Sequence, residues 1–77
     1  MTDSNLSAVI QMVCDIGGIS HLEADQDYYE AGITSMHALP LLLEIEERFQ
    51  VSVPDDRFIN ARTARGLVEL IGELSNP

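Results

Sequence analysis

Apolar residues recur at helical spacing in three separate stretches of this chain, and that periodicity predicts an all-α fold. At about 3.6 residues per turn, the members of each set share one face of a helix, and we expect that face to be buried. The three sets are Leu6, Val9, Ile10, Val13 and Ile16; Ala38, Leu41, Leu42, Ile45 and Phe49; and Ala64, Leu67, Leu70, Ile71 and Leu74.

Residue types that start and stop helices place the ends of the first predicted helix. Asp3 or Ser4 can cap its start, and Gly17-Gly18 can end it. From residue 19 to residue 34 the helical spacing is lost, which predicts a loop. We expect this long loop to be pinned to the core, because it contains several apolar residues: Ile19, Leu22, Tyr28, Tyr29 and Ile33.

Three more helices are predicted in the rest of the chain. The second runs from Ser35 to about Phe49. Pro54 and the two acidic residues after it open a short third helix that ends near Ile59. Thr63 can cap the last helix. The predicted architecture is a small four-helix bundle, with three main helices, a short third helix and a long loop between the first two.

Charge is distributed unevenly along the sequence. The chain carries 13 acidic and 4 basic side chains, for a formal net charge of −9. Residues 1–47 account for all of this excess, since they contain no Lys or Arg. Phosphate backbones and anionic lipid surfaces are bound largely through clustered Lys and Arg, so we expect neither nucleic acid nor membrane as a partner. Basic protein surfaces are the expected complement.

The length of the chain limits what it can do alone. Its 77 residues, 45% of them hydrophobic, predict one small domain over residues 1–77, with no second lobe to close a catalytic cleft. A stand-alone enzyme is therefore not expected. The single Cys14 cannot form an intramolecular disulfide, and no secretory signal or membrane-length apolar run occurs. We expect a cytoplasmic monomer with a small buried thiol at Cys14.

The second predicted helix has more apolar surface than one core needs. Met36, Pro40 and Leu43 lie opposite its core stripe, Leu39 lies on the flank, and Glu47 continues the line. Such a stripe rimmed by acids is typical of a helix that docks on a partner, although it could also be apolar surface without a function or be covered by the long loop. Pro40 lacks the N–H that would pair with the Met36 carbonyl, so we expect a loose or kinked first turn.

Ser35 stands where the predicted loop ends and the second helix begins. A phosphate ester on its hydroxyl would meet the positive end of the helix dipole and backbone N–H groups that have no helical partner. A serine at this position is more often only an N-cap. Spacing alone leaves both interpretations open.

The sequence around Ser35 resembles the attachment site of acyl, aryl and peptidyl carrier proteins. Tyr28-Tyr29-Glu30-Ala31-Gly32-Ile33-Thr34-Ser35-Met36 is similar to that family's aromatic-aromatic-acid-x-Gly-x-x-Ser-Leu motif, whose serine receives a 4′-phosphopantetheine arm. The stretch from Leu42 to Phe49, followed by Val53-Pro54-Asp55, resembles the family's L-x-x-x-E-x-x-F run and the apolar-Pro-acid step after it. Thr63 stands where the family often begins its last helix, so the resemblance covers nearly the whole chain.

This resemblance implies a carrier that does no chemistry of its own. A phosphopantetheinyl transferase would move the arm from coenzyme A to Ser35, and the terminal thiol would hold acyl, aminoacyl or aryl intermediates as thioesters. The pathway would be fatty acid, polyketide or nonribosomal peptide biosynthesis. Thr34 and His37 stand where many members have acids, which implies a specialised carrier rather than a housekeeping fatty-acid one. An activating ligase and downstream transferases or synthases would dock through Met36, Leu39, Pro40, Leu43 and Glu47.

Other chemistries fit the sequence less well. A cofactor-free helical adaptor that binds a basic partner through the same acidic and apolar face of the second helix is the main alternative. A hydrolase acting through Ser35 and His37 is disfavoured, because residues two apart point to different sides of a helix. No metal site is expected. Asp25-x-Asp27 does not continue as an EF-hand loop, and His21 and His37, which we expect to face solvent, lack further ligands at metal spacing.

Overall fold

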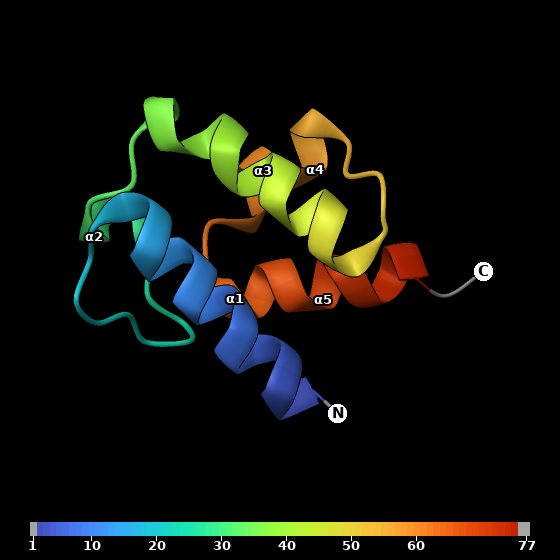
Figure 1. The fold of residues 1–77 in the computed structure, drawn as a ribbon, viewed down its shortest axis with the longest axis horizontal. Helices are drawn as coiled ribbons and strands as arrows, with labels where there is room; N and C mark the ends of the chain where they lie inside the picture. Colours follow the sequence, from blue (N-terminus) through green and yellow to red (C-terminus); the bar gives the residue numbers. More distant parts are fainter. Residues whose placement is uncertain (1, 76–77) are drawn as a thin grey trace.

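Five α-helices follow one another along residues 2–75, the part of the chain that this computed structural model describes (Figure 1). They are α1 (Thr2–Gly17), α2 (Tyr28–Ala31), α3 (Ser35–Phe49), α4 (Asp55–Ala61) and α5 (Ala64–Ser75). No strand occurs among the described residues, and the predicted all-α class is confirmed. The α1 helix packs against both α3 and α5, and α4 packs against α5.

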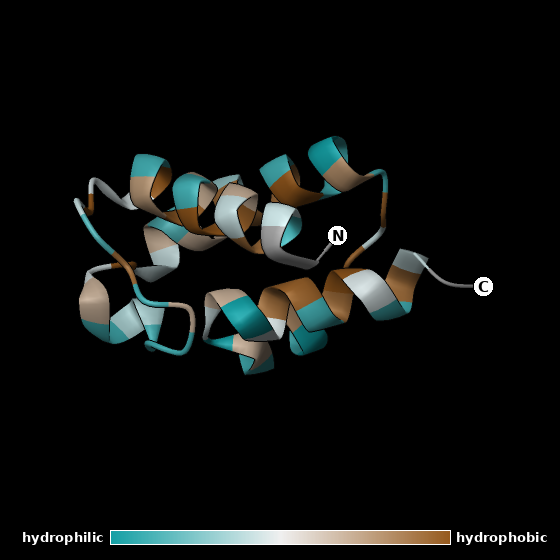
Figure 2. Ribbon diagram, turned by 90° about the horizontal axis from the view of Figure 1, so that it is seen from below, coloured by the Kyte–Doolittle hydropathy of each residue, from teal (hydrophilic) through white to brown (hydrophobic). Residues whose placement is uncertain are grey.

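The apolar faces of α1, α3 and α5 meet in one core, as their spacing predicts. Figure 2 shows hydrophobic bands of the ribbons turned toward the space between the helices. Each large apolar side chain that is fully buried stabilises the fold by about 1.5–3 kcal/mol relative to an exposed one, so a few such residues hold the bundle together. The largest fully buried side chains are Tyr28, Leu41, Ile45, Leu67, Val9 and Val13.

The end of α1 lies where it was predicted, but its start does not. Gly18, just after the helix, has a left-handed φ of 67°, and the N–H of Ile19 donates to the carbonyl of Cys14 at 3.0 Å. This Schellman-type end confirms the predicted stop. The predicted start is wrong, because α1 begins at Thr2 and so has Asp3 and Ser4 inside its first turn. An acidic residue is favourable there, at the positive end of the helix dipole.

The predicted long loop contains a helix of its own, so the described residues form five helices rather than four. Asp27 caps this α2 helix, since its Oδ1 accepts hydrogen bonds from the N–H groups of Tyr29 at 2.9 Å and Glu30 at 3.3 Å. Four residues are too few to show helical periodicity, which explains why the sequence pattern missed α2. The loop is pinned to the core as predicted, with Leu22 and Ile33 buried.

The second half of the chain follows the prediction closely. The α4 helix extends two residues beyond the predicted Ile59, to Ala61. Thr63 caps α5 as predicted, because its Oγ1 accepts a hydrogen bond from the N–H of Gly66 at 2.9 Å. Pro40 lies inside α3, which continues through it without a break. No helix within residues 2–75 combines the length and the apolar character that a membrane span needs.

Candidate functional site

Ser35 is the first residue of α3, and its side chain is exposed. The N-cap is the residue before it. Thr34 has an extended backbone, with φ −116° and ψ 175°, and its Oγ1 accepts a hydrogen bond from the N–H of Met36 at 3.2 Å. The interpretation of Ser35 as an N-cap is therefore wrong, because the chain becomes helical at Ser35 and the capping oxygen must come from one residue earlier. The Ser35 hydroxyl is thus not needed to cap α3.

A second side chain closes the same turn. His37 Nδ1 accepts a hydrogen bond from the N–H of Thr34 at 3.0 Å, which completes a capping box with His37 in the place of the usual Glu or Gln. An imidazole that accepts at Nδ1 carries its proton on Nε2 when it is neutral. His37 is half-buried rather than solvent-facing as predicted, because this contact draws it against the helix start. Its ring is directed to Thr34, so the chain does not offer it as a base for Ser35.

The electrostatics at the start of α3 suit an anion on Ser35. No acidic residue lies in the first turn of this helix. The positive end of its dipole is thus not neutralised by a side chain of the same turn, although the surrounding sequence is strongly acidic. A phosphate ester on the Ser35 hydroxyl would lie at this end of a helix of 15 residues.

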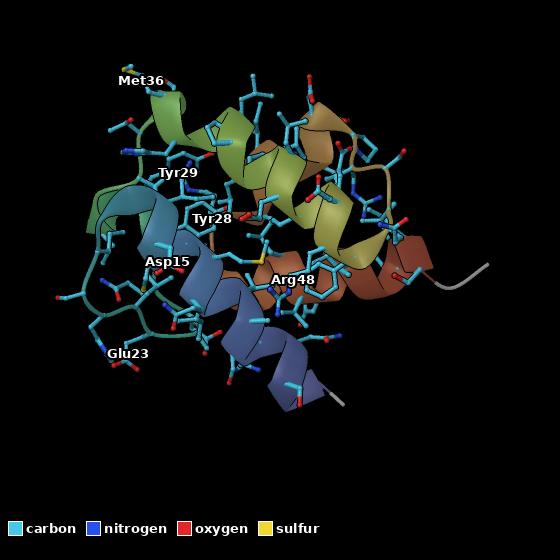
Figure 3. The ribbon with its side chains drawn as sticks, viewed as in Figure 1. Asp15, Glu23, Tyr28, Tyr29, Met36 and Arg48 are labelled. Atoms are coloured by element: carbon cyan, nitrogen blue, oxygen red, sulfur yellow. The ribbon has the colours of Figure 1, made fainter. Side chains whose placement is uncertain are left out.

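The residues predicted to bind partners lie on the exposed side of α3. Relative exposure is 84% for Met36, 60% for Leu39 and 54% for Leu43. Pro40 and Glu47 are exposed as well. We call these five residues the α3 patch. Figure 3 shows the Met36 side chain at the outer end of α3, directed away from the body of the protein. The loop of residues 19–34 therefore does not cover this surface, which leaves docking and apolar surface without a function as the interpretations.

A hollow between α3 and α4 begins beside Ser35. Its volume is about 210 Å³. Ile59 of α4, which is 56% exposed, contributes an apolar side chain that the sequence reasoning missed. Ile59 is exposed because neighbouring residues on a helix point in different directions and Phe58, next to it, is buried. The lining residues are Ser35, Ala38, Leu39, Leu42, Asp55, Phe58 and Ile59.

Metal binding and thiol chemistry both depend on how His, Cys, Asp and Glu side chains are placed. Within residues 2–75, no three His, Cys, Asp or Glu side chains gather in a way that could hold a metal ion. Cys14 is half-buried against the edge of the core, so it is less buried than the predicted small buried thiol. Burial, followed by the charge of Asp15, raises the pKa of its thiol, which lowers the fraction of reactive thiolate.

A family model describing the phosphopantetheine attachment site matches residues 7–71, from within α1 to within α5. The chain belongs to this family. The predicted resemblance is confirmed, and the domain is one to which 4′-phosphopantetheine is covalently attached. No curated protein matches the chain. The residues fit the group, since the exposed Ser35 hydroxyl stands at a helix start that lacks acidic residues, with a mainly apolar hollow beside it.

Proposed function

We propose that Ser35 carries the 4′-phosphopantetheine arm and that the protein delivers thioester-bound intermediates to partner enzymes. The observation that supports this proposal most directly is the position of Ser35. It is exposed, it is the first residue of α3, and its hydroxyl is left out of a capping box made by its neighbours Thr34 and His37. The same residue lies inside the stretch that the family model matches.

The chain supplies the acceptor for the arm and little else. Ser35 Oγ is the nucleophile, and a phosphopantetheinyl transferase must remove its proton, because the nearby imidazole of His37 is engaged with Thr34. Once attached, the arm supplies a terminal thiol that holds acyl, aminoacyl or aryl groups as thioesters. The absence of acidic residues from the first turn of α3 favours the negative charge of the phosphodiester at that point.

The surface around Ser35 is suited to brief contacts with several enzymes. Leu39 of the α3 patch and Ile59 of α4 both line the hollow and are exposed apolar side chains. Residues 1–47, which include most of α3, have an excess of acidic side chains, and this charge attracts basic partner surfaces to the protein. A loading ligase and downstream transferases or synthases would each dock here in turn. Small, charge-steered interfaces of this kind bind weakly and dissociate fast.

The test is the intact mass of the protein after co-expression with a broad-specificity phosphopantetheinyl transferase. We expect the wild-type chain to gain one phosphopantetheine and Ser35→Ala to gain none. Ser52→Ala, which removes an exposed hydroxyl from the connection between α3 and α4, is the matched control and should be modified normally. Ser35→Ala should fold as the wild type does, because Thr34 and not Ser35 caps α3.

Each other outcome has a definite meaning. A modified Ser35→Ala would place the arm on another residue. An unmodified wild-type chain would contradict the carrier proposal. It would favour the cofactor-free adaptor, which needs only the acidic and apolar face of α3.

A further inference from the structure

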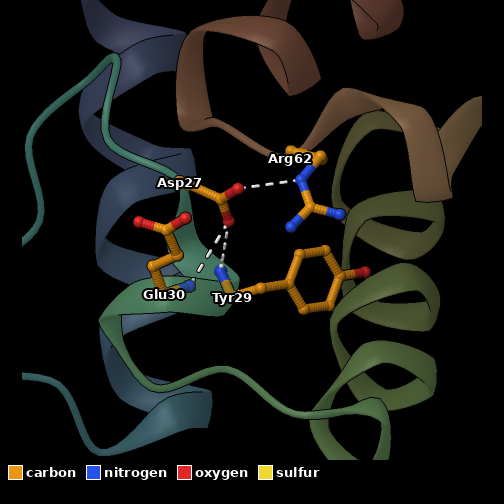
Figure 4. A network of polar contacts seen from close by, with 4 residues as sticks. All are labelled: Asp27, Tyr29, Glu30 and Arg62. Carbon is orange, nitrogen blue, oxygen red and sulfur yellow. Dashed lines mark hydrogen bonds and ion pairs between the residues drawn. The ribbon is translucent and has the colours of Figure 1, made fainter.

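The turn between α4 and α5 is fastened to α2 by three contacts that converge on Arg62. Its Nε donates to Asp27 Oδ2 at 2.8 Å, and its guanidinium carbon lies 4.9 Å from the centre of the Tyr29 ring (Figure 4). Its backbone carbonyl accepts a hydrogen bond from the N–H of Tyr28 at 2.9 Å. The same Asp27 carboxylate caps α2 through its other oxygen. The side chain of Arg62 thus contacts the capping residue and an aromatic ring of α2, while its backbone carbonyl holds the first N–H of the helix.

The path from α2 to Ser35 is short and constrained. Gly32 follows α2 with φ 134°, a value that favours glycine, and the N–H of Ile33 donates to the carbonyl of Tyr28 at 2.9 Å. The side chain of Ile33 is only 3% exposed, and the next residue is Thr34, the cap of α3. Few free torsions remain between α2 and Ser35. The place of α2 on the body of the protein therefore largely fixes the place of the Ser35 hydroxyl.

The backbone of Arg62 is held in an unfavourable conformation. Its φ is 49°, in the left-handed region at the end of α4, where glycine or asparagine is the usual choice. A residue with a long side chain is disfavoured in this conformation, so an arginine here is better explained by contacts of its side chain than by the needs of the turn. Those contacts are the ones it makes with Asp27 and Tyr29.

We propose that Arg62 is a positioning residue for the modification of Ser35. It fastens α2 to the α4–α5 turn and so keeps the first turn of α3 in the arrangement that the phosphopantetheinyl transferase binds. This inference rests on the proposed attachment of the arm to Ser35. Without the Arg62 side chain, α2 and the residues up to Ser35 sample other arrangements, and only a fraction of the molecules is competent for binding at any time.

The experiment compares Arg62→Gly with the wild type in steady-state kinetics of arm transfer, with the concentration of the unmodified carrier varied. Glycine adopts the left-handed φ without strain, so this variant keeps the turn while it removes the side chain. We expect KM for the carrier to rise about five- to tenfold while kcat is retained, because a smaller competent fraction lowers apparent affinity by that fraction. Arg62→Lys keeps the charge without the planar guanidinium and should recover part of the loss.

Arg57→Gln is the control for a general loss of stability. It breaks the ion pair between Arg57 and Glu73, which joins α4 to α5 rather than to α2 and whose side chains are about as exposed as that of Arg62. Its KM should equal that of the wild type. Amide hydrogen exchange supplies an independent readout. In Arg62→Gly the amides of Tyr28 and Ile33 should exchange faster, while the core amides of α1 and α5 keep their protection.

The possible results separate this proposal from the proposed function. An unchanged KM in Arg62→Gly, with a wild-type chain that is modified normally, overturns the positioning role alone. An equal rise in KM in Arg57→Gln, or faster exchange throughout the protein, also overturns it, because the effect would then be general destabilisation. A wild-type chain that gains no arm overturns the proposed function and this inference together.

Discussion

Gly66 and Ala61 approach each other so closely that a Cβ atom on Gly66 would lie 2.5 Å from the carbonyl oxygen of Ala61. Gly66 lies in the first turn of α5 and Ala61 is the last residue of α4, so the contact spans the tight turn at Arg62. Since the atom in the way is backbone, it cannot move aside as a flexible side chain could.

Replacing the two glycines of α5 by alanine should change the stability of the protein in opposite directions. Gly66→Ala should lower the free energy of unfolding by about 1–3 kcal/mol, because the turn must shift to admit the methyl group. Gly72→Ala is the control, since a Cβ there meets nothing within 4 Å. It should raise the free energy of unfolding by up to about 1 kcal/mol through better helix propensity. Urea denaturation of both variants measures the difference, and equal effects would contradict the close approach.

Because the hydroxyl of Tyr28 is buried, we expect phenylalanine at this position to make the protein more stable. The side chain is 0% exposed, and its Oη has no hydrogen-bond partner among the described residues. Tyr28→Phe removes an unsatisfied polar atom without leaving a cavity, so it should raise the free energy of unfolding by about 1 kcal/mol. Urea denaturation near neutral pH checks this. A clear loss of stability would mean that the hydroxyl makes a favourable contact after all.

The buried phenol of Tyr28 should also make the stability of the protein fall at alkaline pH. Burial, followed by the charges of Tyr29 and Asp27, raises the pKa of the Tyr28 phenol above its ordinary value of 10.0. The folded state therefore holds the phenol proton more tightly than the unfolded state does, so this contribution to stability is present below pH 10 and lost as pH rises further. In the Tyr28→Phe variant, the decline of stability above that pH should be shallower, as measured by thermal unfolding across a pH series.

Acid should loosen the contact between Asp27 and Arg62. The hydrogen bond from Arg62 is the main cause that lowers the pKa of the Asp27 carboxyl, with the N–H groups of Glu30 and Tyr29 adding to it. A carboxyl whose pKa is lowered on folding stabilises the protein above its unfolded pKa, and this contribution is lost as pH falls through the folded value. Asp27→Asn keeps the capping oxygen but not the charge. The wild type should be more stable than this variant at neutral pH, and the gap should narrow as pH falls below 3.8, the ordinary pKa of this carboxyl.

The three long helices could be predicted from sequence because their apolar residues repeat often enough to define a face. The α2 helix could not, since it is stabilised by contacts between residues far apart in the chain, above all Asp27 with Arg62. The residues next to Arg62 in the sequence give no indication that its side chain contacts the loop of residues 19–34. Side-chain patterns predict pairing across such a distance only when the intervening fold is already known.

The start of α3 at Ser35 was predicted correctly, but the residue that caps it was not, since the N-cap is Thr34. Serine and threonine are both good N-caps, so the pair Thr34-Ser35 does not show which one precedes the helix. The choice depends on where the extended backbone ends, and that point is set by the burial of Ile33 just before the pair. The exposure of the α3 patch was easier to predict, because it follows directly from the identity of the opposite, buried face.

The capping role of Thr34 predicts the effect of two substitutions. Thr34→Ala removes the oxygen that accepts from the N–H of Met36 and should lower the free energy of unfolding by about 1 kcal/mol. Thr34→Asp keeps an oxygen there and adds a charge that the helix dipole favours, so it should be at least as stable as the wild type. Chemical denaturation gives both values. If Thr34→Ala were as stable as Thr34→Asp, the cap would contribute nothing.

The α3 patch predicts that contacts with partner enzymes can be weakened without harm to the fold. Leu43 is 54% exposed, so Leu43→Asp should change the free energy of unfolding by no more than about 0.5 kcal/mol. A charge in an apolar contact is costly, so KM for the carrier in arm transfer should rise at least about fivefold, equivalent to about 1 kcal/mol. Ser7→Asp, on the exposed side of α1, adds the same charge elsewhere and should leave KM unchanged. An equal rise in both variants would point to overall charge, and no rise in either would show that the transferase binds a different face.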